Sequence, residues 1–116
     1  TPAYSVQVGS YEQIGRQITV RFNILLSGWT GSPTGSVAIG GLPVASANVA
    51  NDQGICTIGF YNTAGLAVLS YGLAGYIDPN TSIARIVQNG NVSSASLTAA
   101  QAGTAFNIYG MCNYRT

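Results

Sequence analysis

Few side chains in this chain of 116 residues could carry acid-base or metal chemistry. There is no histidine, so the usual proton shuttle and the commonest metal ligand are both missing. Neither a Ser-His-Asp nor a Cys-His site can form, and the sequence contains no phosphate-binding or dinucleotide-binding glycine motif. We therefore expect no cofactor, no metal site and no enzyme activity.

Three carboxylates remain for glycoside hydrolysis, which needs two acids on either side of one sugar. They are Glu12, Asp52 and Asp78. Each lies beside a turn or a strand end, where acids are commonly solvated, so we interpret them as surface groups. Only a site shared between subunits would bring two of these carboxylates to the same sugar. The run 78–81 (Asp-Pro-Asn-Thr) has too few acids for a calcium loop and is interpreted as a turn.

The two cysteines are the other reactive groups. Cys56 and Cys112 fall in phase with apolar neighbours on expected strands, so both are interpreted as small buried apolar side chains. A disulfide needs α-carbons within roughly 7 Å of each other, which the sequence does not establish. In a bacterial cytoplasm we expect reduced thiols.

Tyrosine and tryptophan could bind a ligand without catalysis, because each joins an apolar ring to a polar tip. The chain has seven Tyr and one Trp against three Phe. Trp29 lies in a segment rich in Gly, Ser and Thr, where it caps the end of the fold, fills a subunit seam or contacts a ligand. The sequence leaves open whether Tyr76 lies in a subunit seam, in the core or on a binding face. The residues expected to face a ligand are Trp29, Tyr61, Tyr76, Arg85 and Asn89.

Ionised groups make up only 6% of the chain, against about 25% in an ordinary soluble domain. Ser, Thr, Asn and Gln supply 36 uncharged polar residues, so hydroxyl and amide groups must form most of the wet surface. The net charge of +1 removes the repulsion that keeps monomers apart. We expect an obligate oligomer.

The same composition argues against several partners. Four separated arginines and no lysine cannot neutralise a run of phosphates, so neither nucleic acid nor an anionic membrane surface is expected. No stretch approaches the roughly 18 apolar residues of a membrane-spanning helix, so we expect no membrane insertion. The residues after Thr1 do not resemble a secretory signal, and we expect a fragment of a longer protein.

The periodicity of the chain is that of β-strands. From Gln17 to Ile24 every even position is apolar and every odd position is polar, as in a strand with one buried face. Cys56, Ile58 and Phe60 form a similar apolar set. Further strands, bounded by turn-forming residues or sharing the alternation, are expected at 37–39, 56–60, 71–77, 82–88 and 106–114.

Helical signal is limited to one turn over 96–102, ended by Gly103. Asn89-Gly90 predicts a hairpin, because both residues tolerate the positive φ of a type I′ turn. About eight short strands separated by turns predict a single all-β domain over 1–116, built as an antiparallel β-sandwich or jelly roll.

Several segments spread along the chain resemble a known family. They are 4–24, 35–43, 75–79 with the following Ser82-Ile83, 95–98 and 110–115. With these segments the chain resembles the C-terminal β-sandwich domain at the tips of bacteriophage tail fibres and tailspikes. The shared motifs are mostly turns and strand ends, so they are specific for fold more than for ligand. Asn80 stands where glycine is expected, and asparagine still permits a left-handed turn.

The resemblance implies a homotrimer in the virion tail, assembled in the bacterial cytoplasm and acting at the host surface. We expect a non-catalytic tip domain that trimerises the fibre end and binds host cell-surface polysaccharide, either lipopolysaccharide or capsule. Neutral side chains would match sugar hydroxyls, aromatic rings would cover apolar sugar faces, and three copies would add avidity. The alternative is a structural trimerisation cap without ligand. Part of a polysaccharide-degrading tailspike, with a site shared between subunits, is the third possibility.

Overall fold

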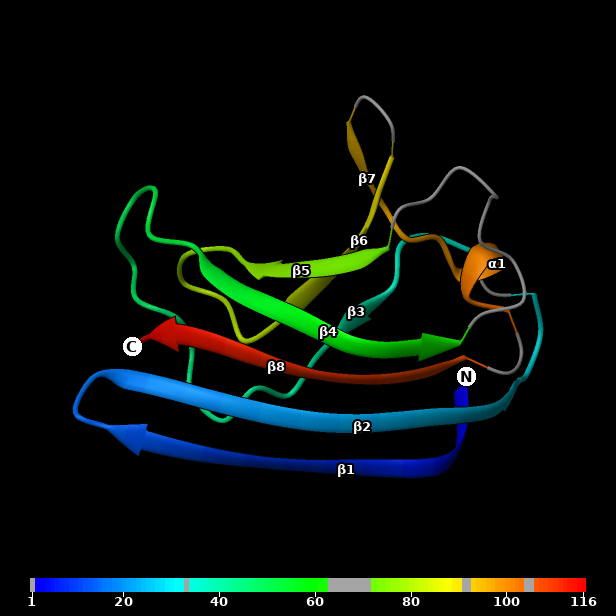
Figure 1. The fold of residues 1–116 in the computed structure, drawn as a ribbon, viewed down its shortest axis with the longest axis horizontal. Coiled ribbons are helices and arrows are strands. Elements are labelled where there is room, and N and C mark those ends of the chain that lie inside the picture. The colour runs from blue at the N-terminus through cyan, green and yellow to red at the C-terminus, as the bar shows by residue number, and fades with distance from the viewer. Residues whose placement is uncertain (1, 33, 63–71, 91–92, 104–105) are drawn as a thin grey trace.

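The computed structural model describes residues 2–32, 34–62, 72–90, 93–103 and 106–116. Within these residues, eight strands and one short helix follow one another along the chain (Figure 1). They are β1 (Pro2–Ile14), β2 (Gln17–Trp29), β3 (Ala38–Ile39), β4 (Gly54–Asn62), β5 (Leu73–Ile77), β6 (Ala84–Asn89), β7 (Ser94–Ser96), α1 (Ala99–Ala102) and β8 (Asn107–Arg115).

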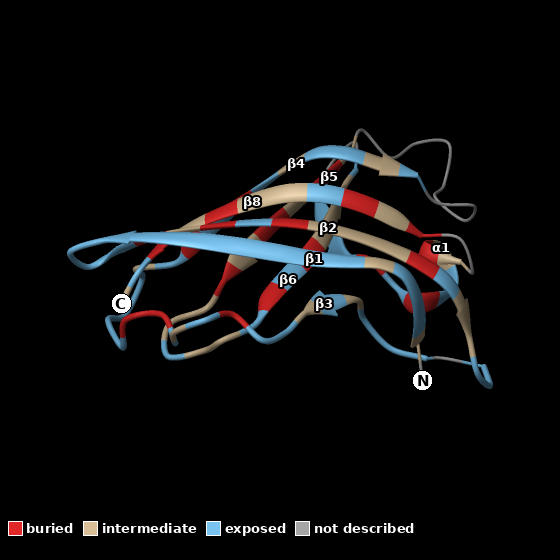
Figure 2. Cartoon of the chain, turned by 90° about the horizontal axis from the view of Figure 1, so that it is seen from below, coloured by how far each residue is buried: buried red, intermediate tan, exposed pale blue. Residues whose placement is uncertain are grey.

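All the strands belong to one hydrogen-bonded sheet, and every pairing is antiparallel. Its order is β1-β2-β8-β4-β5-β6-β3, and β7 pairs with β6 off this path. The long strands β1, β2, β8 and β4 form a broad layer, and β6 and β3 lie across it on one side (Figure 2). The predicted antiparallel all-β class is confirmed, in the form of one curled sheet of eight strands.

The inner face of the sheet, defined as the face that the curl encloses, carries the core. On β2 the even residues Ile18, Val20, Phe22 and Leu26 are buried there, as the alternation predicts. Their partners on β8 share that face, because residues directly opposite each other in an antiparallel pair project to the same side. The strand predicted from Gln17 to Ile24 is therefore confirmed, and it continues to Trp29.

β1 is the largest element that the periodicity did not predict. It pairs with β2 through a tight turn in which Gly15 has a φ of 59°. It ends the sheet path, and its residues are exposed or half-buried over the whole strand. The outer face, opposite the core, and the free edge of β1 are therefore the surfaces of the sheet that remain open.

Phe60 corrects one sequence-based expectation. The alternation placed it on one face with Cys56 and Ile58, but a β-bulge between Ile58 and Phe60 shifts the register against β8. The extra residue, Gly59, turns Phe60 to the outer face, where 45% of its surface is exposed. A bulge reverses the face of every later residue in the strand, and alternation alone does not reveal it.

The cysteines also differ from expectation. Cys56 on β4 lies directly opposite Cys112 on β8, with α-carbons 4.0 Å apart, and the two form a disulfide rather than reduced thiols. Both are buried, as predicted. Gly75 on β5 leaves room for the bond, because a β-carbon there would lie 2.8 Å from Cys56 Cβ. Strand pairing, which the sequence does not show, brings the two sulfur atoms together.

The helical turn is confirmed and the hairpin is confirmed in part. Thr98 and Gln101 form a capping box at the start of α1, and Gly103 ends it with a φ of 68°. β6 and β7 form the expected hairpin, but Asn89 pairs with Ser94 inside it and does not have a positive φ. Asn80 has a positive φ, of 58°, as the expected left-handed turn requires. Residue 71 of the strand predicted over 71–77 lies outside the described residues.

Candidate functional site

Trp29 lies at the end of β2, beside the end of α1. Its indole N–H donates a hydrogen bond of 2.8 Å to Gly103 O. The half-buried ring packs against the core, so it closes one end of the curled sheet. The ring also borders a groove, and its contact with a ligand remains a prediction.

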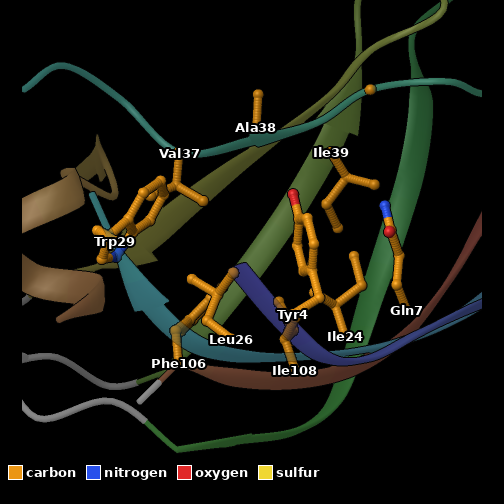
Figure 3. Close-up of a pocket in the computed structure, with 11 residues that line it drawn as sticks. Tyr4, Gln7, Ile24, Leu26, Trp29, Val37, Ala38, Ile39, Phe106 and Ile108 are labelled. Carbon is orange, nitrogen blue, oxygen red and sulfur yellow. The ribbon is translucent and has the colours of Figure 1, made fainter. Parts of the chain in front are cut away.

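The groove beside Trp29 opens between β1 and β3, the strands at the two ends of the sheet path. Figure 3 shows Tyr4 of β1 beside Ile39, and Trp29 beside Val37. Its lining is mainly apolar and contains no ionised side chain. The cavity volume is about 110 Å³, well below the roughly 300–1,000 Å³ of typical small-molecule sites. The groove can hold part of a ligand but cannot enclose one.

Tyr61 and Asn89 both lie close to Gly72. Tyr61 is half-buried on the inner face and packs against the core, with its hydroxyl 3.9 Å from where a β-carbon on Gly72 would lie. The Asn89 backbone N–H donates to Gly72 O at 2.9 Å. The Asn89 side chain accepts a hydrogen bond of 2.9 Å from Ser94 Oγ. Packing and the hairpin account for these contacts.

Tyr76 and Arg85 are opposite each other on β5 and β6, on the outer face. Arg85 Nε donates to Asp78 Oδ2 at 2.8 Å. This hydrogen bond and the charge of Asp78 raise the pKa of Arg85 above its usual value. Arg85 is therefore held by a neighbour within its own chain.

The structure does not bring the five predicted residues into one site. Tyr76 and Arg85 are adjacent on the outer face, whereas Tyr61 and Trp29 pack against the core from the inner side. Residue type suggested all five, but the face on which each lies depends on register and bulges.

An exposed aromatic pair is the site feature that the sequence analysis missed. Phe60 of β4 and Tyr109 of β8 are directly opposite on the outer face, with ring centroids 4.9 Å apart and planes inclined by 29°. We call this pair the aromatic platform. In the sequence, Tyr109 is out of phase with the apolar residues of its strand, and this phase was the one available sign that it lies on the outer face. The sequence gives no such sign for Phe60, because its exposure depends on the bulge.

The outer face carries further large apolar side chains. Val8 and Ile14 on β1 and Ile55 on β4 are all exposed, in addition to the platform. Such a face, opposite a complete core, is typical of a sheet that packs against another surface.

Of the three acids, Asp78 follows the end of β5, Asp52 precedes the start of β4, and Glu12 lies in β1. Asp78 pairs with Arg85, Asp52 lies 3.6 Å from Arg115, and Glu12 is on exposed β1. Within the described part of the chain, no three His, Cys, Asp or Glu side chains are grouped as a metal site.

Comparisons of the chain with protein-family models, curated proteins and solved structures found no match. Among the described residues, no helix has the length and apolar character needed to cross a membrane.

Proposed function

We propose that this chain is a non-catalytic tip domain of a bacteriophage tail fibre or tailspike. In this proposal it forms a homotrimer and binds host cell-surface polysaccharide. The two halves of the curled sheet act as the layers of the sandwich that the family resemblance implies. The observation that carries the proposal is the exposure of β1.

β1 exposes large apolar side chains on both of its faces. Tyr4 and Tyr11 project from one side, and Val8 and Ile14 from the other. Ile14 alone has 80% of its surface exposed. Glu12 is the one ionised residue on the strand. Little charge opposes contact between copies, so burial of β1 would stabilise an assembly.

The uncharged polar surface supports the adhesive part of the proposal. A polysaccharide presents many hydroxyl groups, and Asn, Gln, Ser and Thr can match them as donors and acceptors. Each contact is weak, but three copies on one axis raise the overall affinity without any new contact.

Light scattering after size exclusion tests the assembly. The assembly should have three times the 11.9 kDa mass of one chain, and the double variant Tyr11→Ser/Ile14→Ser should dissociate. The matched control is Val49→Ser/Ile83→Ser, which removes two exposed apolar side chains outside β1. A monomeric parent chain, or equal dissociation of both variants, contradicts assembly through β1.

Titration with host lipopolysaccharide and capsule tests adhesion. Binding is expected at millimolar to micromolar sugar, without release of new reducing ends. A trimer that binds neither polymer is a structural cap, and new reducing ends would show an enzyme whose site spans subunits.

A further inference from the structure

We infer that the aromatic platform, with the amides of Asn23 and Asn107, is a binding subsite for a neutral pyranose. This inference rests on the proposed function, since it assigns the place at which a polysaccharide is bound. Neither platform residue was among the five predicted from the sequence.

Strand register places these side chains together. Tyr109 lies between Phe60 on β4 and Asn23 on β2, so the three form one row across the outer face. Asn107 precedes Tyr109 by two residues and therefore shares its face. Opposed side chains have β-carbons about 4.5–5.5 Å apart and diagonal neighbours about 7–8 Å. Two amides thus border one ring of an exposed aromatic pair.

A hollow adjoins the platform. Its lining comprises Tyr109 and Met111 together with Thr57, Gly59 and Gly110. Gly59 is the residue that the bulge adds, and a β-carbon there would meet nothing within 4 Å. The cavity volume is about 220 Å³, also below the roughly 300–1,000 Å³ of typical small-molecule sites, so the hollow can hold part of a sugar ring. The edge of the Tyr109 ring is therefore open to a ring-shaped ligand.

The amides supply the chemical argument for a hydroxyl-bearing ligand. Asn23 Oδ1 and Asn107 Oδ1 are buried and accept no hydrogen bond from the described residues. A buried acceptor without a donor is unfavourable, and the terminal torsion of asparagine is soft enough to turn the oxygen outward. A sugar hydroxyl can donate to it, whereas a carboxylate or phosphate brings acceptors alone. The orphaned oxygens therefore favour a ligand with hydroxyl groups, such as a sugar, over a simple carboxylate or phosphate ion.

The outer face carries little charge near the hollow, which is compatible with binding of a neutral sugar. Arg21, opposite Met111, is the ionised neighbour of the hollow on β2. Its N–H groups can donate to sugar oxygens. The carboxylate of an acidic sugar would be attracted to Arg21, whereas the oxygens of Asn23 and Asn107 need only hydroxyl donors, so a neutral and an acidic sugar are compared in the test.

The first experiment locates the site by NMR on the full chain. Methyl glucoside, methyl galactoside and methyl mannoside are added to about 100 mM, since single-site binding is expected in the millimolar range. Glucuronate is the acidic comparison. Shifts in the ring signals of Phe60 and Tyr109 and the amide signals of Asn23 and Asn107, larger for a neutral glycoside, support the inference. Shifts confined to the Trp29 indole, or larger shifts with glucuronate, overturn it.

The second experiment uses two variants that act differently. Tyr109→Ala removes one stacking ring, and Gly59→Val fills the hollow while leaving both rings in place. Each should weaken glycoside binding about tenfold without changing the oligomeric state. The matched control is Ile55→Ala, which removes an exposed apolar side chain from the outer face of β4 away from the platform.

The outcomes separate this inference from the proposed function. If host polysaccharide binds the parent chain and both variants equally, the subsite is wrong and adhesion stands. If the variants dissociate the trimer and sugar binding is unchanged, the platform is a subunit seam and the subsite is overturned. If glycosides bind at the platform but no host polysaccharide does, the subsite stands and adhesion to that host fails. Binding of neither overturns both.

Discussion

The Phe22 ring lies over Gly110 of the neighbouring strand and occupies the space that a side chain there would need. A β-carbon on Gly110 would lie 2.5 Å from Phe22 Cζ and 2.9 Å from Thr57 O. The pair joins β2 to β8 within the core, so the glycine is required by packing rather than by backbone conformation.

Gly110→Ala should therefore lower the free energy of unfolding by about 1–3 kcal/mol, because the added methyl overpacks the core. Gly28→Ala is the matched control on β2, since a β-carbon there meets nothing within 4 Å. Its effect should stay within roughly 0.5 kcal/mol. Urea denaturation measures both, and equal losses would contradict the packing argument.

Burial of the Tyr114 hydroxyl predicts that the folded chain loses stability at alkaline pH. Its side chain is 3% exposed, and its hydroxyl donates to Val44 O at 2.8 Å. Burial raises the pKa of Tyr114 above its usual value, with a smaller contribution from Tyr11. The folded chain holds the proton more tightly than the unfolded chain. The resulting stabilisation is complete below about pH 10 and is lost as pH rises through the folded pKa.

Calorimetry between about pH 8 and 11 should show Tm falling more steeply for the parent chain than for Tyr114→Phe. At pH 8 the free energy of unfolding of the variant should also be lower than that of the parent chain by about 1 kcal/mol, because the variant loses the hydrogen bond to Val44. Identical slopes for the two proteins would show that this proton is not linked to folding.

Residue type placed Tyr76 and Arg85 among the ligand-facing residues, and the structure shows that they are opposite each other on the outer face. Their contact with a ligand stays a prediction. The aromatic platform was missed because Phe60 appeared in phase with the core, and the bulge that exposes it has no signature in residue order. The orphaned amide of Asn23 was equally hidden, since hydrogen-bond satisfaction is a property of the folded chain.

Among the elements, β2 and β8 were predictable because one face of each is buried and the other is not. β1 was not, because both of its faces are exposed and its side chains show no contrast between core and solvent. The disulfide belongs to the same class of feature, since it depends on β4 pairing with β8 across 56 residues. Alternation indicates strands, and it does not indicate their neighbours.

A pair of prolines on β1 tests its position as an edge strand. In a tight hairpin the residues flanking the turn exchange hydrogen bonds, so even residues of β1 such as Val8 donate to β2 and odd ones such as Gln7 donate outward. Val8→Pro should cost about 1–3 kcal/mol of folding free energy, whereas Gln7→Pro should cost much less. Thermal unfolding of the two variants measures the difference. The reverse order would mean that the free edge of β1 is paired.

At the scale of the whole molecule, a curled sheet brings residues distant in sequence into one core and leaves one broad face open. The core includes residues of β2, β8, β4, β5 and β6, and the disulfide is part of it. The expectation of reduced thiols was wrong because the two strands that carry them are neighbours.

Loss of the disulfide should reduce global stability. The loop between Cys56 and Cys112 spans 56 residues, so closing it in the unfolded chain is worth about 4 kcal/mol in the chain-entropy model. Cys56→Ala/Cys112→Ala should lose an amount of that order in guanidinium unfolding. The parent chain should show no thiol reactive to Ellman's reagent even when unfolded. One or two reactive thiols would contradict the bond.

The same covalent loop has a mechanical consequence. Tension applied between the chain ends can extend only the segments before Cys56 and after Cys112, because the disulfide bears the tension in place of the intervening residues. In optical-tweezer stretching, reduction should add about 190 Å of contour length for the released 56 residues. A pulled chain would thus extend only outside the covalent loop and would keep the residues between Cys56 and Cys112 from being drawn out.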